Sequence, residues 1–200
     1  MNEAALRDEI CRVGKSLFER GLVSGSAGNI SVRLPDHAGF LITPTDACLG
    51  FLQADQLAHV NPQGEQVAGE RASKTLTLHR RIYAAEPAAH CVLHTHSTHL
   101  VALTLQGAWS ADDVLPPITP YYVMKVGHVP LIPYCRPGSP EMAARVVLAI
   151  DKARAAGRTV RAVLHELSLT IERGEIAGLP QPEWDNAIVA TGPLTSPALS

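Results

Sequence analysis

The sequence predicts a single α/β domain built on a mixed β-sheet, and three observations support this fold class. Short runs of alternating apolar and polar residues before residue 70 are suited to pair as hairpins. Runs with apolar residues at helical spacing are interleaved with these strands. The chain of 200 residues is long enough for one domain that buries roughly 70% of its unfolded surface. Interleaved helices and strands of this kind form layered α/β domains.

The first third of the chain predicts one long helix and two hairpins. Asn2 is suited to cap the helix and Gly21 to end it. In each hairpin, a turn that contains proline and glycine joins two short strands. The predicted elements are a helix at 2–21, a hairpin of strands 30–34 and 40–42, a short helix at 54–57, and a hairpin of strands 59–60 and 66–67.

The rest of the chain predicts further helices and strands and then an irregular end. Ser73 is suited to cap one helix, and Ser139, followed by Pro140, another. The segments 121–124 and 129–134 look like short edge strands punctuated by proline. The predicted elements are helices at 73–87, 97–107 and 139–157, and strands at 91–93, 121–124, 129–134 and 161–164. We expect a domain at 1–175 and an irregular tail at 176–200, with at most one element near 184–189.

Composition and charge argue against several classes of protein. The formal net charge of -2 gives no reason to expect nucleic acid or an anionic membrane as a partner. No apolar run approaches the ~20 residues of a membrane span, and the N-terminus lacks the apolar region of a signal peptide. The 4 cysteines are scattered, which favours free thiols in a reducing cytoplasm over a disulfide framework. The sequence therefore predicts a cytoplasmic globular protein.

The most informative stretch is His94-Thr95-His96-Ser97, which follows the apolar run Cys91-Val92-Leu93. On a strand, side chains two residues apart point to the same face, so His94 and His96 are predicted to lie side by side. Two imidazoles in this arrangement can bind one divalent metal through nitrogen. The alternative is a pair of hydrogen-bonded histidines without a metal. Cys91 lies on the opposite strand face and is therefore not predicted to be a ligand.

Two segments have the chemistry of an anion-binding site. The small residues at 24–28 lead into Asn29 and would let backbone N–H groups approach an anion. Ser73 and Lys74 add a hydroxyl, an ammonium group and free N–H groups at the positive end of a helix dipole. The alternatives are a plain connection at the first segment and simple capping beside a solvated lysine at the second. His79 is predicted to be an ordinary helix-face histidine rather than a ligand.

Five motifs together fall in the order and approximate spacing of one known family. They are Gly25-Ser26-Ala27-Gly28-Asn29-Ile30-Ser31, Thr43-Pro44-Thr45, Ala72-Ser73-Lys74, His94-Thr95-His96-Ser97 and Pro130-Leu131-Ile132-Pro133-Tyr134. The set resembles the class II aldolase/adducin-head family over about residues 5–165. Within that family, the segments 115–124 and 134–138 are most similar to the 3-oxo-tetronate 4-phosphate decarboxylases.

The resemblance implies a fold, an assembly and a cofactor. The fold is a three-layer α/β/α domain around a mixed, largely antiparallel sheet, in a homotetramer whose active sites lie near subunit interfaces. The cofactor is a divalent metal, usually zinc, with His94 and His96 as ligands. The resemblance also implies that a phosphorylated sugar or sugar-acid substrate is held at four positions, which are Asn29, Thr45, Ser73 and Lys74.

The chain departs from the pattern of the family at three positions. Asp46 stands beside Thr45, where a glycine is common. Thr75 stands where the family has an acidic residue, so no catalytic residue is assigned. The third metal histidine of the family would fall on Ser168, with His165 and His128 as other candidates for that ligand.

The resemblance implies a metal-dependent lyase that converts a sugar-acid phosphate to dihydroxyacetone phosphate and carbon dioxide. Loss of carbon dioxide requires no proton removal from a hydroxyl group. The lack of a carboxylate at Thr75 therefore affects a decarboxylase less than an aldolase. The alternatives are a class II sugar-phosphate aldolase and a non-catalytic member similar to the adducin head, which Thr75 and Ser168 favour.

Overall fold

The structure is a computed structural model in which residues 2–105, 110, 113–136, 139–158, 162–165 and 187–191 are described. Its helices are α1 (Glu3–Glu19), α2 (Leu76–Ala85), α3 (Thr98–Leu105), α4 (Pro120–Lys125) and α5 (Pro140–Ala155), with 3-10 turns η1 (Pro35–His37), η2 (Leu49–Phe51) and η3 (Ala54–Gln56). Its strands are β1 (Asn29–Arg33), β2 (Phe40–Ile42), β3 (Ala58–Val60), β4 (Gln66–Ala68), β5 (Cys91–Thr95), β6 (Leu131–Ile132), β7 (Ala162–His165) and β8 (Ala187–Thr191).

The strands form one sheet in the order β4-β3-β2-β1-β5-β8-β7-β6. From β4 to β5 every neighbouring pair is antiparallel. From β5 to β6 every pair is parallel. Four of the seven pairings among the described strands are therefore antiparallel, which confirms the predicted mixed, largely antiparallel sheet.

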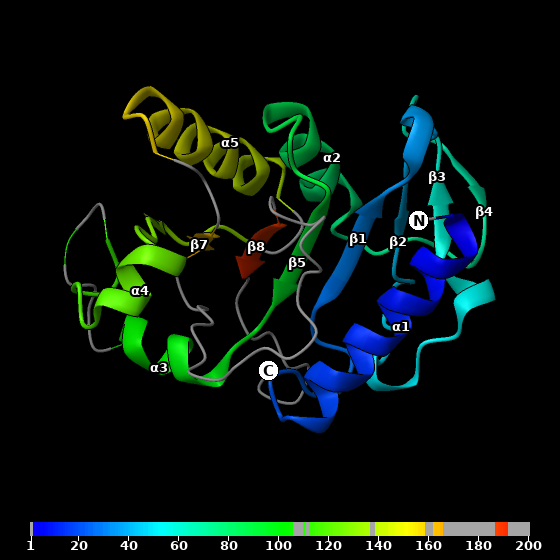
Figure 1. Cartoon of the computed structure of the whole chain (residues 1–200), viewed down its shortest axis with the longest axis horizontal. Helices are drawn as coiled ribbons and strands as arrows, with labels where there is room; N and C mark the ends of the chain where they lie inside the picture. Colours follow the sequence, from blue (N-terminus) through cyan, green and yellow to red (C-terminus); the bar gives the residue numbers. More distant parts are fainter. Residues whose placement is uncertain are drawn as a thin grey trace.

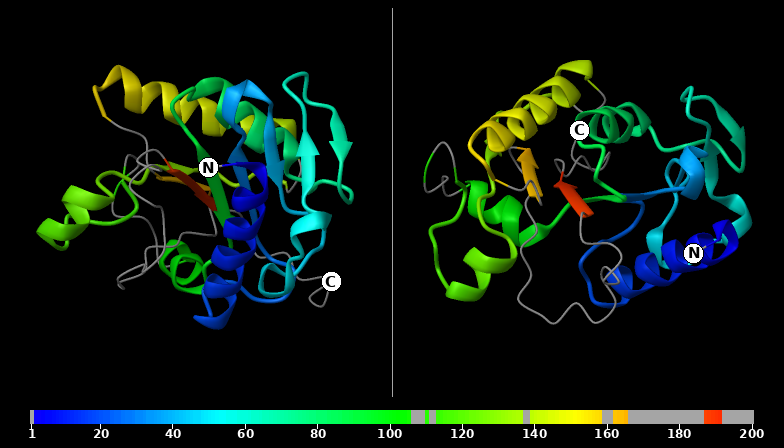
Figure 2. Two further views of the ribbon diagram at one scale, coloured as in Figure 1. Left: turned by 45° about the vertical axis from the view of Figure 1, so that its right-hand side comes forward. Right: turned by 45° about the horizontal axis from the view of Figure 1, so that its top comes forward.

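Helices cover both faces of the sheet, as Figures 1 and 2 show. On one face α1 packs its buried side chains against those of β1 and against Cys91 and Leu93 of β5. On the other face α2 and α5 pack against β2, β3 and β5. This arrangement confirms the three-layer α/β/α fold. No helix within the described ranges is both long enough and apolar enough to span a membrane.

Several helices and hairpins begin and end where the capping residues and turns predict. The side chain of Asn2 accepts a hydrogen bond from the N–H of Ala5 at 2.9 Å, and the helix ends before Gly21, whose φ is +69°. The first hairpin pairs β1 with β2, and the second pairs β3 with β4. Ser139 caps α5 through the N–H of Glu141 at 3.2 Å. Predicted capping residues and turns therefore fix most of these boundaries.

The predicted strand at 121–124 is wrong, because this segment is helix α4. Thr119 accepts a hydrogen bond from the N–H of Tyr122 at 3.1 Å, and Pro120 occupies the first helical turn. A capping threonine followed by proline is a strong helix start. Here it outweighs the preference of tyrosine and valine for strands. The strand predicted at 129–134 is reduced to Leu131–Ile132, between two prolines.

The predicted cap of the 73–87 helix is also wrong. The helix begins at Leu76, and Thr75 occupies the N-cap position without a side-chain capping bond. The N–H of Ser73 donates to the Thr43 carbonyl oxygen at 3.2 Å, and Ala72 pairs with Pro44. These contacts hold the segment extended beside β2 until the helix starts.

Within the segment 176–200, which was expected to be irregular with at most one element near 184–189, the structure describes one strand. Residues 187–191 form β8, which lies between β5 and β7 in the sheet. The weak signal near residues 184–189 corresponds to this strand. Gly107, Ser168 and most of the remaining tail lie outside the described residues.

Candidate active site

Strand β1 separates the polar site from the apolar core by simple alternation. Ile30 and Val32 are buried in the cluster around α1. Asn29 and Ser31 point the other way, where both contact His79 of α2. Asn29 pairs with His94 of β5 across the antiparallel ladder. Asn29 on β1 therefore lies next to both His79 of α2 and His94 of β5.

The two histidines of the His-x-His stretch lie side by side, as predicted. The ring centroids of His94 and His96 are 4.8 Å apart, and the ring planes are inclined by 43°. His94 is 4% exposed, and its Nε2 atom and the Nδ1 atom of His96 are both buried. Gly28 allows the close approach of β1, because a Cβ there would lie 2.8 Å from the His94 carbonyl oxygen.

This histidine pair fits a divalent metal as two of its ligands, since two adjacent imidazoles offer nitrogen donors on one side of the strand. Within the described ranges, no group of three or more His, Cys, Asp and Glu side chains forms a complete metal site. Ser168, the position implied for the third histidine, lies outside those ranges. The described part of the chain therefore supplies two of the usual three protein ligands.

By strand order, His128 is less favourably placed than His165 as a third ligand within one chain. His128 precedes β6, which β7 and β8 separate from β5. Three strand spacings amount to about 14 Å. The Nδ1 atom of His128 instead lies 2.5 Å from a carboxylate oxygen of Asp113, whose other oxygen accepts the N–H of Val129 at 2.9 Å. His128 as a third ligand therefore stays a prediction.

His165 is nearer to the pair by strand register. It is the last residue of β7, and only β8 separates β7 from β5. Leu164 is paired with Thr191, which is paired with Thr95. His165 therefore lies one residue beyond this level on β7, as His96 does beyond β5. Two strand spacings are about 10 Å, so the backbone position of His165 is compatible with a metal site that includes His94 and His96. The role of His165 as the third metal ligand stays a prediction.

Asn29 connects His94 with the start of α2. Its Nδ2 atom lies 3.0 Å from Nδ1 of His94. Its Oδ1 atom lies 2.9 Å from the hydroxyl of Thr75 and 2.5 Å from Nε2 of His79. The structure thus places Thr75, the residue in the position of the family's acid, one side chain away from His94. The amide of Asn29 thus joins His94, Thr75 and His79, and its phosphate contact stays a prediction.

The sequence predictions missed the buried hydrogen-bond chain behind Asn29. His79 is fully buried, and its Nδ1 atom lies 2.7 Å from the Ser31 hydroxyl, which is 2.8 Å from the Tyr83 hydroxyl. Burial lowers the pKa of His79 to about 3, so its ring is neutral at physiological pH. The spacing of Asn29 and Ser31 on one strand, opposite a helix that carries His79, is the sequence signal that could have revealed it.

The other predicted phosphate positions surround the turn before α2. The hydroxyl of Thr45 is buried, and none of the described residues forms a hydrogen bond with it. The hydroxyl of Ser73 lies 3.0 Å from that of Thr75. Lys74 is exposed, and its Nζ atom lies 2.9 and 2.8 Å from the two carboxylate oxygens of Asp46. A bound phosphate group would compete with Asp46 for this lysine.

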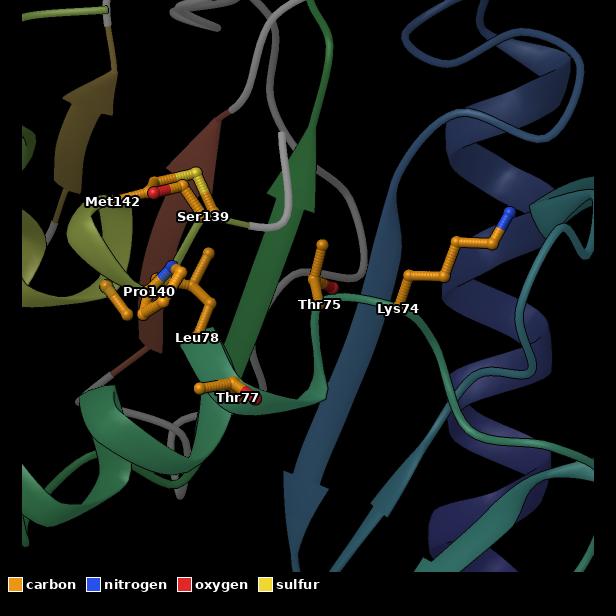
Figure 3. Close-up of a pocket in the computed structure, with 8 residues that line it drawn as sticks. Lys74, Thr75, Thr77, Leu78, Ser139, Pro140 and Met142 are labelled. Atoms are coloured by element: carbon orange, nitrogen blue, oxygen red, sulfur yellow. The ribbon is translucent and has the colours of Figure 1, made fainter. Parts of the chain in front are cut away.

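A small cavity opens beside the same turn. Its volume is about 100 Å³, and its walls come from the first turns of α2 and α5. In Figure 3 the Lys74 side chain points away from the α5 wall, whereas Thr75 and Leu78 lie between the two helix starts. Two helix N-termini make such a cavity electrostatically positive. The lining residues are Lys74, Thr75, Thr77, Leu78, Ser139, Pro140, Met142 and Ala143.

The fold and the site define a class of protein: a three-layer α/β/α domain with a histidine pair at the end of a central strand and a hydroxyl-rich turn beside it. The model of the Class II Aldolase and Adducin N-terminal domain matches residues 8–165. The chain therefore belongs to the class II aldolase and adducin N-terminal domain family. Class II aldolases depend on a divalent metal.

Three comparisons place the chain more closely within this family. A 3-oxo-tetronate 4-phosphate decarboxylase from Cupriavidus necator is 65% identical over 144 residues, which are 72% of this chain and 65% of that protein. An L-fuculose phosphate aldolase from Haemophilus influenzae is 30% identical over 158 residues, 78% of this chain and 69% of that protein. The crystal structure of YgbL from Klebsiella pneumoniae, a candidate aldolase/epimerase/decarboxylase, is 46% identical, with a TM-score of 0.68, and the match covers 76% of this chain and 72% of that chain.

The chain spans just under two thirds of the length of the Cupriavidus relative. The family match ends at residue 165, so residues 166–200 lie beyond it.

Proposed function

We propose that the protein is a divalent-metal-dependent carbon–carbon lyase that decarboxylates a 3-oxo-tetronate 4-phosphate. The products are dihydroxyacetone phosphate and carbon dioxide. The observation that carries this proposal is the side-by-side pair of His94, which is buried, and His96 at the end of β5. The names of the relatives at 65% and 43% identity support the choice of substrate.

A metal bound by His94 and His96 would act as a Lewis acid toward oxygen atoms of the substrate. We propose zinc, because imidazole nitrogen is among its usual ligands. Residues of the chain orient the metal ligands and contact the substrate. Asn29 orients His94 through the contact with Nδ1. Thr75 offers a hydroxyl rather than a carboxylate, which suits a reaction whose leaving group, carbon dioxide, requires no proton to be removed.

The phosphate group of the substrate would be held by Thr45, Ser73 and Lys74, with Asn29 as the fourth predicted position. The buried hydroxyl of Thr45 and the start of α2 support this proposal. Backbone N–H groups at a helix start and the positive end of its dipole favour an anion. Asp46 must release Lys74 before the ammonium group can meet a phosphate.

Four further points belong to the proposal. Residues 1–175 form the catalytic domain, which the family match over 8–165 supports. We propose that this domain ends at residue 175 and that residues 176–200 form a separate tail segment, of which β8 joins the sheet. The protein assembles as a homotetramer with active sites near subunit interfaces, as the family resemblance implies. We also propose a cytoplasmic location, which the 4 scattered free cysteines support.

Two other functions remain alternatives, each with an observation in its favour. A class II sugar-phosphate aldolase is supported by the 30% identity to an L-fuculose phosphate aldolase. A non-catalytic protein similar to the adducin head is supported by Thr75, which is hydrogen-bonded to Asn29 and Ser73 in place of an acid. Thr75 argues against the aldolase more than against the decarboxylase, since aldol cleavage must remove a hydroxyl proton.

The decisive experiment measures carbon dioxide release from a 3-oxo-tetronate 4-phosphate by the full chain with added zinc. We expect release by the parent protein, and its loss when both His94 and His96 are replaced by Ala. The exposed His99 provides the matched control, and His99→Ala should keep the parental rate. Aldehyde release from L-fuculose 1-phosphate without decarboxylation would select the aldolase. Neither activity in a zinc-loaded, folded protein would select the non-catalytic alternative.

A further inference from the structure

A buried chain of hydrogen bonds runs from α2 to the proposed metal site. It leads from the Tyr83 hydroxyl to Ser31 at 2.8 Å and from Ser31 to Nδ1 of His79 at 2.7 Å. It continues from Nε2 of His79 to Oδ1 of Asn29 at 2.5 Å, and from Nδ2 of Asn29 to Nδ1 of His94 at 3.0 Å. All five residues are buried. Each link constrains the position of the protons in the next.

The direction of the last link decides which nitrogen of His94 can bind a metal. The Nδ2 atom of an amide can only donate, so Nδ1 of His94 must accept and carries no proton. The proton of a neutral His94 then lies on Nε2. A protonated ring nitrogen has no lone pair for a metal. In this arrangement the nitrogen that does not face Asn29 is the one that carries the proton.

A second arrangement satisfies the same contacts with the polarity reversed. If the Asn29 amide rotates by a half turn, its oxygen accepts a proton from Nδ1 of His94 and its nitrogen donates to Nε2 of His79. The neutral His79 must then carry its proton on Nδ1 and donate to the hydroxyl of Ser31. The hydroxyls of Ser31 and Thr75 can donate or accept, so they fit both arrangements. Nε2 of His94 then carries the lone pair that could bind a metal.

We propose that His79 is a positioning residue for the metal: its tautomer sets, through the amide of Asn29, which nitrogen of His94 faces the metal. This inference rests on the proposed metal-binding function. Metal binding selects the arrangement in which His79 is protonated on Nδ1. Each imidazole keeps one proton in both arrangements, so the network releases no proton when it changes. The neutral ring that this requires agrees with the complete burial of His79.

Nitrogen NMR of the full chain labelled with 15N-histidine tests this inference without any assay of activity. Long-range proton–nitrogen spectra at neutral pH report which ring nitrogen of each histidine carries the proton. We expect His79 to be protonated on Nε2 without metal and on Nδ1 after zinc is added. Zinc-dependent shifts of His94 and His96 with an unchanged His79 tautomer would overturn the inference alone. No zinc-dependent change at His94 or His96 would overturn the metal site as well.

The Asn29→Asp variant provides a second test. A carboxylate only accepts hydrogen bonds, so it would hold the proton of His94 on Nδ1 in the presence and absence of metal. Outer-sphere partners of metal-bound histidines typically change affinity by about 10–100-fold. We expect the variant to bind zinc at least about tenfold tighter than the parent, measured by competition with a chromophoric chelator. Equal or weaker binding by a folded Asn29→Asp variant would contradict the inference.

Discussion

Asp46 binds the ammonium group of Lys74 through both of its carboxylate oxygens, at 2.9 and 2.8 Å. The backbone of Asp46 is in the left-handed region, with φ of +57°. Glycine, asparagine and aspartate adopt this conformation more readily than other residues do. The glycine that is common here in the family would leave Lys74 without this carboxylate. The turn thus carries an internal anion beside the proposed phosphate site.

Asp46→Asn should strengthen the binding of a phosphorylated substrate analogue. Asparagine keeps the left-handed backbone but removes the charge that competes for Lys74. Both side chains are mostly exposed, at 65% and 68%. Exposed ion pairs contribute at most about 1 kcal/mol, and 1.4 kcal/mol corresponds to a tenfold change. We therefore expect a gain of about two- to fivefold in affinity by calorimetry.

Two controls separate this effect from others at the same turn. An unphosphorylated analogue should bind the parent and Asp46→Asn equally. In a Lys74→Ala background, Asp46→Asn should produce little gain, because the ammonium group that Asp46 holds is absent. Lys74→Ala alone should weaken only the phosphorylated analogue. A loss of equal size for both analogues would assign Lys74 to the fold or to another part of the ligand.

The burial of neutral His79 should make stability depend on pH in a defined window. Its pKa is about 3 in the folded protein, below the ordinary value of 6.5, because burial disfavours the charged ring. Between these values the unfolded chain binds the additional proton, so the free energy of unfolding decreases as the pH falls below 6.5. The stabilisation that comes from the lowered pKa of His79 is complete above pH 6.5 and is lost progressively as the pH falls toward 3.

This prediction is measured by urea unfolding of the parent and the His79→Gln variant at pH 7, 6 and 5. The difference between the unfolding free energies of the parent and the variant at each pH cancels the contributions of the other titrating groups. Well below pH 6.5 the parent should lose up to about 1.4 kcal/mol per pH unit relative to the variant. Parallel pH profiles would mean that the pKa of His79 is the same in the folded and the unfolded protein.

Thr75→Glu should raise the rate of decarboxylation. Thr75 lies at the N-terminus of α2 and contacts Asn29, so a glutamate there would sit beside the proposed metal site and at the positive end of the helix. A general acid–base group typically contributes about 10²–10⁴-fold. A glutamic acid could deliver the proton that the enediolate must take up after carbon dioxide has left, so we expect a gain of at least about tenfold in kcat. Thr75→Gln is the control, because it adds the same length without a carboxylate, and an equal gain from it would contradict an acid–base role.

Gly28→Ala should weaken both folding and zinc binding. A Cβ at Gly28 would lie 2.8 Å from the carbonyl oxygen of His94, and the backbone φ is +88°. Alanine at a positive φ costs more than about 1 kcal/mol. Gly25→Ala is a matched control, since Gly25 also has a positive φ, +54°, but its Cβ would meet no atom within 4 Å. Equal losses of stability and zinc affinity in both variants would show that the contact with His94 is unimportant.

The parts of the fold that depend on local signals could be predicted from the sequence. Asn2, Gly21 and Ser139 mark helix ends, and the period of two along β5 places His94 beside His96. The segment 121–124 could not be predicted by propensity, because its tyrosines and valine favour strands whereas Thr119 and Pro120 start a helix. Capping decided the outcome there.

The relations across the sheet were not predictable from one sequence. Asn29 meets His79 across 50 residues, and Lys74 meets Asp46 across 28. No periodicity within a segment records which strand lies opposite which helix. The motifs identified Asn29 and Lys74 as functional, but their observed partners come from the strand pairing of β1 with β5 and from the turn that precedes α2.

The alternation along β1 limits how this protein can evolve. Asn29 and Ser31 supply the polar network, whereas Ile30 and Val32 fill the core beneath α1. A shift by one residue in a strand moves every side chain to the other face. A single-residue insertion between Asn29 and Ser31 would therefore put their side chains on opposite faces, so that one of them points toward the core. Substitutions in β1 can adjust the chemistry gradually, but insertions and deletions there would remove the site and the core in one step.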